Sequence, residues 1–289
     1  MTTDPTSTPA AASPAAPIQA GFIGLGSQGG PMARRIVDAG FPLTLWARRA
    51  EALDPFADTP AQVASTPAAL GAASDVVGVC VVADADVEDV VLRDDGVLAG
   101  MAPGGVIAIH ATVHPDTCRR LAAAAAPKGV GVIDAPVSGG GDAAAARRLL
   151  VMVGGADADV ARARPVLDTY ADPLIHLGPL GSGQMAKLMN NFVFTAQIAV
   201  ATDTYGLAAD LGIDRAALAR VLAHGSGGSR AADIVAASGF DLRPMAQVAA
   251  GLLRKDVGLT LDVAAAAGAA VAPTLTALTT RALTLLDAT

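Results

Sequence analysis

Lys187 and Asn191 are the residues whose types and spacing most directly suggest chemistry. They lie four residues apart in the segment GSGQMAKLMNN (181–191), which becomes helical after its glycines, so both side chains project from one helix face. A cation and an amide side by side, among apolar neighbours, can bind one oxygen-bearing molecule. Strand-like and helical runs alternate before this segment and helical runs follow it. We therefore expect it to lie at a seam between two domains, where ligand sites are common.

Lys187 is suited to move a proton during hydride transfer. Reduction of an aldehyde leaves negative charge on the carbonyl oxygen, to which an ammonium donates a proton; in reverse, a neutral lysine accepts the proton of the alcohol. Asn191, one turn on, can orient the same oxygen. The alternative, a solvated helix lysine, is disfavoured by the apolar neighbours Met185, Ala186 and Leu188. In a reaction of this kind, which also needs a hydride carrier, Lys187 is the candidate general acid and base.

A glycine-rich turn near the start of the chain predicts the site of that carrier. Residues 20–24 read as a buried strand, the sequence GLGSQG follows, and a helical run then extends to Ala39. Gly24 permits the tight turn, Gly26 lets the backbone approach a pyrophosphate, and Gly29 lets the helix pack against the strand. The helix N-terminus presents free N–H groups to the phosphates. The alternative is a glycine-rich turn without a ligand. The expected dinucleotide contacts are Gly24, Leu25, Gly26, Ser27, Gln28 and Gly29.

The end of the next strand bears on the choice of cofactor. NAD-binding chains place an Asp or Glu there to hold the ribose 2′-hydroxyl. Here residues 43–46 form the expected strand, no acid stands at 46–49, and Arg48 and Arg49 follow. Two arginines can pair with a 2′-phosphate and stack on adenine. We favour NADP(H), with NAD(H) possible; the alternative is that both arginines are solvated residues at a helix start.

Further Val- and Ile-rich runs alternate with helical runs and predict a buried parallel sheet. The expected strands are 76–82, 106–110, 130–134, 149–153 and 174–177, and the expected helices between them are 85–92, 116–126 and 157–170. Ligands bind beyond the carboxyl ends of such strands. Three loops lie there: 83–85, with Ala83 expected at the cofactor, 111–113, and 135–141. The last is rich in small residues whose amides suit a carboxylate, although a flexible connection is the alternative.

From Gly183 onward the pattern is almost entirely helical. One long helix over 183–209 is apolar almost all round and is therefore expected to be buried. Shorter helices are expected at 215–223, 231–237, 245–267 and 274–286. Because alanine-rich faces permit close helix contacts, we expect a homodimer or homotetramer.

The predicted fold class is α/β, with a Rossmann-type doubly wound, mainly parallel sheet followed by an all-α domain built around one long buried helix. We place a disordered tail at residues 1–17, the NAD(P)-binding Rossmann domain at 18–180, and an all-helical substrate and oligomerisation domain at 181–289.

Composition narrows the class of protein further. The 289 residues are 52% hydrophobic and 16% charged, enough for two substantial cores. The net charge of −7 and the 3% of aromatic residues argue against nucleic acid and anionic membranes as partners. Only two cysteines are present, no segment reads as a signal peptide or membrane span, and the four histidines are scattered without ligand spacing. We expect a cytoplasmic protein without a metal site.

Four segments together resemble the β-hydroxyacid dehydrogenases, a family that includes 3-hydroxyisobutyrate dehydrogenase, tartronate semialdehyde reductase and glyoxylate/succinic semialdehyde reductases. The segments are FIGLGSQGGPMA (22–33), DAPVSGG (134–140), GSGQMAKLMNN (181–191) and Lys255-Asp256. They occur in the family's order and cover the chain from about residue 19 to its end. The chain departs from the family's usual residues at Gln28, Val82, Ala83 and Ala111.

The resemblance implies a role for each matching residue. Lys187 matches the catalytic lysine, and Asn191 matches the amide that holds the substrate's hydroxyl or carboxylate. Thr112 matches a threonine at the nicotinamide end of the cofactor, and Lys255 a lysine that closes over cofactor and substrate. The residues that match the substrate-carboxylate loop are Ser138, Gly139 and Gly140. The implied substrate is a small carboxylate-bearing molecule, a β-hydroxyacid or semialdehyde acid.

Other functions remain open at this point. An imine reductase resembles the same family but generally lacks the lysine, so Lys187 disfavours it. A decarboxylating 6-phosphogluconate enzyme would need a longer helical half. A cofactor-binding sensor without turnover would not need a proton donor. His224 and the following loop 225–229 either line the substrate pocket or form an interhelical turn.

Overall fold

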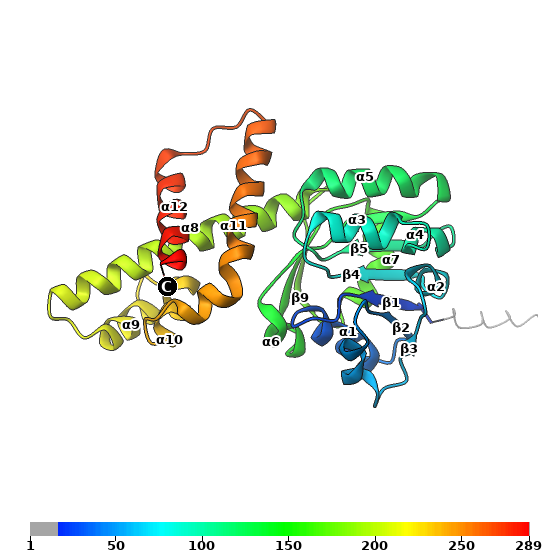
Figure 1. Cartoon of the computed structure of the whole chain (residues 1–289), viewed down its shortest axis with the longest axis horizontal. Helices are drawn as coiled ribbons and strands as arrows, with labels where there is room; N and C mark the ends of the chain where they lie inside the picture. The colour runs from blue at the N-terminus through cyan, green and yellow to red at the C-terminus, as the bar shows by residue number, and fades with distance from the viewer. Residues whose placement is uncertain (1–16, 289) are drawn as a thin grey trace, which may run out of the picture.

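A parallel sheet with helices on its faces forms the first part of the protein, and a group of helices forms the second (Figure 1). The structure, a computed structural model, describes residues 17–288. The predicted tail at residues 1–17 lies outside the described residues except for Pro17.

The main sheet has six strands in the order β3-β2-β1-β4-β5-β6, and every neighbouring pair is parallel. Its strands are β1 (Ala20–Ile23), β2 (Leu43–Trp46), β3 (Gln62–Val63), β4 (Val76–Val79), β5 (Val106–Ile109) and β6 (Gly131–Asp134). β1, β4 and β5 are buried along their whole length, because both faces of the sheet are covered. From β1 the chain adds strands first toward one edge of the sheet (β2, β3) and then, from β4 on, toward the other edge. In such folds ligands bind at this point, between β1 and β4. The predicted fold class is confirmed.

Helices cover both faces of this sheet and a small second sheet extends the first part. The helices of the main sheet are α1 (Gly29–Asp38), η1 (Ala50–Phe56), α2 (Pro67–Ala72), α3 (Asp84–Leu92), α4 (Val97–Gly100), α5 (Pro115–Ala125) and η2 (Ala126–Lys128). The second sheet holds β7 (Val137–Ser138), β8 (Leu149–Val153) and β9 (Ala171–His176), with α6 (Gly140–Ala145) and α7 (Asp157–Leu167) in the connections. A bridge between Asp134 and Gly154 joins the two sheets.

The predicted strand at 76–82 is shorter in the structure. β4 ends at Val79, because residues 80–83 leave the sheet and form the loop that precedes α3. This loop lies beside the glycine-rich turn, since the Cys80 amide donates to the Ile23 carbonyl oxygen at 2.8 Å. The shorter strand therefore makes room for a ligand at the reversal point of the sheet.

The second part is built on the long helix α8 (Ser182–Asp210), which extends out of the α/β part and carries the other helices (Figure 1). These are α9 (Arg215–His224), α10 (Arg230–Ala237), α11 (Arg243–Ala266) and α12 (Pro273–Asp287). One face of α8 packs against them, while a stripe of apolar side chains on the helix stays exposed in the isolated chain. The stripe consists of Met185, Met189, Val193, Val200 and Leu207.

The Asp134 carboxylate fixes the start of α8 to the end of β6. Asp134 is fully buried; its Oδ1 accepts a hydrogen bond from the Gly181 amide and its Oδ2 one from the Gln184 amide, both at 2.6 Å. An acid at a helix N-terminus satisfies free N–H groups and the positive end of the dipole. A side chain at Gly183 would collide with the Met152 carbonyl oxygen, 2.3 Å from the Cβ position. The helix can therefore begin only where a glycine lets it approach the sheet.

Candidate functional site

A cavity of about 360 Å³ lies where the glycine-rich turn, the ends of β4 and β5, α8 and α11 meet. It contains Lys187 and Asn191 from α8, Lys255 and Asp256 from α11, and Thr112 from the loop after β5. The remaining lining residues are Gly26, Ser27, Gln28, Gly29, Cys80, Val81, Val82, His110, Ala111, Val137, Ala249, Leu252 and Leu253. Residues far apart in the sequence are thus gathered around one space.

Lys187 is the titratable residue of this cavity best placed to exchange a proton near neutral pH. The residue is only 9% exposed. Burial lowers the pKa of Lys187 to about 8; the nearby Asp256 carboxylate opposes this shift, and the Lys255 ammonium adds to it. Within residues 17–288 no hydrogen bond or ion pair engages its ammonium. The lysine can therefore hold or release a proton inside the cavity.

Asp256 links Asn191 to Lys255. The Asn191 Nδ2 donates to Asp256 Oδ2 at 2.6 Å, and the Asn191 Oδ1 accepts from Asn190 Nδ2 at 3.0 Å, which leaves the second Nδ2 hydrogen of Asn191 as a donor for a ligand oxygen. Asp256 Oδ1 lies 2.9 Å from Lys255 Nζ, as an ion pair whose alignment falls short of a hydrogen bond. The Lys255 Nζ also donates to the Thr112 carbonyl oxygen. These contacts hold the helical part against the loop after β5.

The glycine-rich turn has the shape that a pyrophosphate requires. A Cβ at Gly29 would lie 1.9 Å from the Gly24 carbonyl oxygen, and one at Gly24, whose φ is +93°, would lie 2.1 Å from the Cys80 carbonyl oxygen. Side chains are therefore excluded at both positions. At Gly26 a Cβ would meet nothing within 4 Å, because this position faces open space. The turn thus keeps open the room in front of the α1 N-terminus that a dinucleotide needs.

A second cavity, of about 210 Å³, adjoins the turn at the ends of β1 and β2. Both Arg48 and Arg49 line it, as do Asp86 and Asp89 of α3. Arg48 is exposed, and its Nη1 lies 3.7 Å from Asp86 Oδ1. An arginine this exposed and this loosely paired can turn toward a ligand phosphate.

Some predicted site residues lie outside the two cavities. Val137 lines the larger cavity, whereas the residues of the expected carboxylate loop, Ser138, Gly139 and Gly140, are not among its lining residues. Gly139 and Gly140 have φ values of +131° and +76° and turn the chain into α6. That turn packs against the glycine-rich turn, since a Cβ at Gly141 would lie 2.3 Å from the Ser27 carbonyl oxygen.

Ala83 and His224 also line neither of the two cavities. Ala83 is the N-cap of α3, and Val81 and Val82 of the same loop line the cavities instead. His224 ends α9, and residues 225–229 form the turn to α10, in which the Ser229 hydroxyl accepts a hydrogen bond from the Ala232 amide. Of the two interpretations of this loop, the structure matches the interhelical turn.

Two further groups in the cavity wall are unsuited to proton transfer or nucleophilic attack. Burial lowers the pKa of His110 to about 4, and its Nδ1 lies 2.7 Å from the Ala135 carbonyl oxygen. A carbonyl only accepts, so Nδ1 carries the proton and Nε2 accepts from the Tyr170 hydroxyl at 3.0 Å. Burial also raises the pKa of the Cys80 thiol to about 12. Both residues support the sheet, and Lys187 remains the candidate acid and base.

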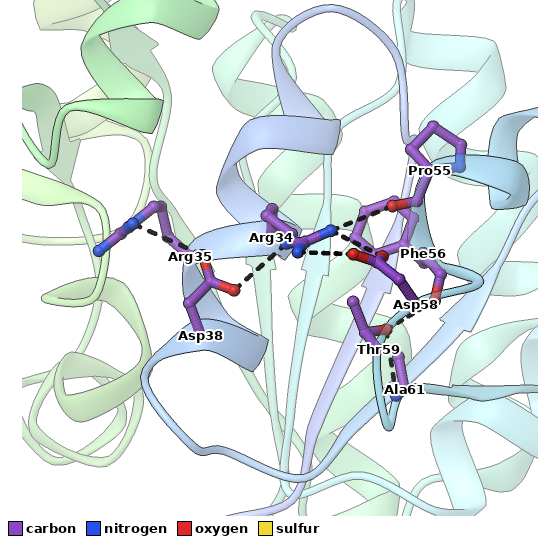
Figure 2. Close-up of polar contacts among 8 residues, drawn as sticks. All are labelled: Arg34, Arg35, Asp38, Pro55, Phe56, Asp58, Thr59 and Ala61. Atoms are coloured by element: carbon purple, nitrogen blue, oxygen red, sulfur yellow. Dashed lines mark hydrogen bonds and ion pairs between the residues drawn. The ribbon is translucent and has the colours of Figure 1, made fainter.

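Arginine contacts brace α1, the helix that follows the glycine-rich turn (Figure 2). Arg34 of α1 pairs with Asp38 one turn on and donates to both carboxylate oxygens of Asp58 and to the Pro55 carbonyl oxygen. These bonds tie α1 to the end of η1 and to the segment that follows it.

The sequence pattern did not assign roles to Asp256, Gln184 or the α11 residues Ala249, Leu252 and Leu253. Asp256 stood beside Lys255 in a matching segment, and this position was the only signal available for it. The α11 residues gave no signal, because apolar helix residues usually form cores and only packing decides which ones line a cavity.

Within residues 17–288, no group of three His, Cys, Asp or Glu side chains is arranged to hold a metal ion. Among the same residues no helix is both long enough and apolar enough to cross a membrane.

Two protein-family models together match almost the whole described chain. The NAD binding domain of 6-phosphogluconate dehydrogenase matches residues 19–178. The model described as NAD-binding of NADP-dependent 3-hydroxyisobutyrate dehydrogenase matches residues 181–288. The boundary between the matches falls just before α8.

Curated and solved relatives agree with these matches. The chain is 34% identical over 255 residues to a 3-hydroxyisobutyrate dehydrogenase from Pseudomonas aeruginosa, with 83% of each chain covered. It is 33% identical over 259 residues to an NAD-dependent L-serine dehydrogenase from the same organism, with 86% of each covered. A structure of a Mycobacterium tuberculosis 3-hydroxyisobutyrate dehydrogenase with L-serine superimposes with a TM-score of 0.80 at 29% identity, covering 94% of each chain.

Proposed function

The chain belongs to the β-hydroxyacid dehydrogenase family, as an oxidoreductase that binds a nicotinamide cofactor, and we propose that it transfers hydride between NADP(H) and a small β-hydroxyacid or semialdehyde acid. The observation that carries the proposal is the buried Lys187, whose pKa is about 8, in the same cavity wall as the glycine-rich turn. A proton donor and a dinucleotide site that share one space are the two parts this reaction requires.

In the proposed reaction each residue of the cavity has a separate role. The bound nicotinamide supplies or accepts the hydride. Lys187 donates a proton to the carbonyl oxygen during reduction and accepts the hydroxyl proton during oxidation. Asn191, held by Asp256, orients that oxygen. Lys255 neutralises the substrate's carboxylate and, through Thr112, draws α11 over the cavity to exclude water.

The Ser138–Gly140 turn belongs to the proposed site as the place of the substrate's carboxylate. Its support is the family resemblance of these residues together with the open φ > 0 turn beside the glycine-rich loop. Thr112 is proposed to contact the nicotinamide end, and residues 18–180 and 181–289 to act as the cofactor and substrate domains. We also propose a cytoplasmic enzyme, since its two cysteines are free thiols suited to a reducing compartment.

A substrate screen tests the reaction directly. Purified protein with NADPH and glyoxylate, succinic semialdehyde or methylmalonate semialdehyde, or with NADP⁺ and 3-hydroxyisobutyrate or L-serine, should change the cofactor absorbance with at least one substrate. Turnover of a cyclic imine alone would favour an imine reductase. Cofactor binding without turnover of any substrate would favour a sensor.

The preference for NADP(H) is proposed from Arg48 and Arg49 in the smaller cavity. We expect Arg48→Asp to lower kcat/KM for NADPH about tenfold, because a charge-assisted contact with the 2′-phosphate is lost and a repulsion is introduced. Turnover with NADH should stay within about twofold, as judged from the same expected contact. Steady-state kinetics with both cofactors measures the shift, and Arg281→Asp, in a surface pair with Asp203, is the matched control. An unchanged ratio of the two values would remove the argument for NADP(H).

A homodimer or homotetramer is proposed from the exposed stripe of α8. Five large apolar side chains along one helix face are expected to be covered by another subunit. Light scattering should therefore report at least a dimer, and Val200→Lys should shift the protein toward monomer. Ala209→Lys, exposed on the same helix but off the stripe, should leave the assembly unchanged. A monomeric wild-type protein would contradict this proposal.

A further inference from the structure

Gln184 joins the loop after β5 to the helix that carries Lys187. Its side chain is fully buried. The side-chain Oε1 accepts a hydrogen bond from the Val113 amide at 3.1 Å, and Nε2 donates to the Ala111 carbonyl oxygen at 2.8 Å. The amide thus pairs with the backbone on both sides of Thr112, as a neighbouring strand would, and fixes which way this residue faces.

The backbone of Gln184 is also held in place. Its backbone amide donates to Asp134 Oδ2, which holds the first turn of α8 against the end of β6. Lys187 follows three residues later, nearly one helical turn on. The Thr112 carbonyl oxygen meanwhile accepts a hydrogen bond from Lys255. A single side chain therefore sets the spacing between the 111–113 loop and the lysine, while both line one cavity.

We propose that Gln184 is a positioning residue that sets the geometry between the nicotinamide-facing loop 111–113 and Lys187, acting through Thr112 and the first turn of α8. The proposal rests on the proposed function for its kinetic consequence. Hydride transfer needs reacting atoms within a few tenths of an ångström of their best separation. Loss of the Gln184 hydrogen bonds would let this separation vary, which lowers the rate of hydride transfer without changing cofactor affinity.

The chemistry of the two hydrogen bonds permits a sharp substitution. Methionine in place of Gln184 fills a similar volume and makes neither bond. A glutamate side chain makes both only when protonated, because a carboxylate cannot donate to the Ala111 carbonyl oxygen. Burial and the adjoining Asp134 carboxylate raise the pKa of the introduced carboxyl. The Cys118 thiol also faces this position and stays neutral, since burial raises its own pKa.

The experiment compares Gln184→Glu, Gln184→Met and wild type in the reduction direction. We expect Gln184→Glu to lower kcat about 100-fold at pH 8 and to recover to within about fivefold of wild type at pH 5.5, while Gln184→Met stays low throughout. The dissociation constant for NADPH should change less than about threefold in both variants, as only the spacing is altered. The primary deuterium isotope effect with 4-deuterated NADPH should rise, because hydride transfer becomes the slow step. Gln197→Met, farther along α8, is the control.

Two results of this comparison would overturn the proposal. One is wild-type kcat and isotope effect in both variants at every pH. The other is a loss of activity that matches the loss of folded protein in thermal unfolding, without acid recovery in Gln184→Glu.

A wild-type protein that turns over no substrate would remove the proposed function. In that case amide hydrogen exchange tests whether Gln184 holds the loop 111–113 against α8. The Val113 amide should exchange at least about tenfold faster in Gln184→Met than in wild type, because it loses its acceptor. Unchanged exchange would overturn the positioning role independently of activity.

Discussion

Replacing Lys187 by alanine is expected to lower kcat about 1,000-fold, within the usual range for the loss of a general acid or base. The proton must then come from water, which is a weaker acid than an ammonium and is not held in place beside the reacting oxygen. The dissociation constant for NADPH should stay within about twofold, because the role proposed for Lys187 is at the reacting oxygen and not at the phosphates. Stopped-flow measurement of a single turnover and fluorescence titration of NADPH give the two values.

Three comparisons separate this effect from a general disturbance. Lys187→Arg keeps the charge but cannot release its proton, so oxidation should be lost as fully as in the alanine variant. Small primary amines added to Lys187→Ala should restore part of the rate. Lys255→Ala should mainly raise KM for the acid substrate. Unchanged turnover in Lys187→Ala would remove the mechanism.

Replacing Gly26 by alanine is expected to weaken NADPH binding about 100-fold, equivalent to roughly 3 kcal/mol. The position faces open space, so the added methyl group harms nothing in the protein and occupies room that the pyrophosphate needs. Calorimetric titration should show the loss in affinity, and thermal unfolding without cofactor should be unchanged.

The neighbouring glycines provide matched controls. Gly29→Ala should weaken binding and also lower the unfolding temperature, because its Cβ would lie 1.9 Å from the Gly24 carbonyl oxygen. Gly30→Ala, whose Cβ meets the Leu25 carbonyl oxygen at 3.2 Å, should have only a small effect on either. Full NADPH affinity in Gly26→Ala would contradict the placement of the pyrophosphate.

The parts of the molecule that local sequence controls were predictable. The turn at Gly24 follows from the conformational freedom of this glycine and from the close packing of Gly29 against it, five residues on. Lys187 and Asn191 lie on one helix face because their spacing matches the helical repeat. The buried parallel strands follow from continuous Val and Ile runs. Each of these features depends on neighbours in the chain, so its signal is present in the sequence.

Features that depend on packing between distant segments were not predictable in the same way. Asn191 meets Asp256 only because α11 packs against α8, and nothing local to either residue reports that pairing. Gln184 reads as an ordinary helix residue until its bonds to Ala111 and Val113 are seen. The whole of the long helix was expected to be buried because it is apolar almost all round, yet one stripe of α8 is exposed in the isolated chain. Apolarity alone does not distinguish a core position from a subunit interface.

The pH dependence of kcat/KM for oxidation by the wild-type enzyme tests the role of Lys187 most directly. Lys187 must be neutral to accept the hydroxyl proton, and its pKa is about 8. The kcat/KM for oxidation should therefore rise about tenfold per pH unit below about pH 8 and level off above it. In reduction the value should be level below this pH and fall above it. A profile that is flat from about pH 6 to 10 in both directions would contradict a lysine that exchanges the proton.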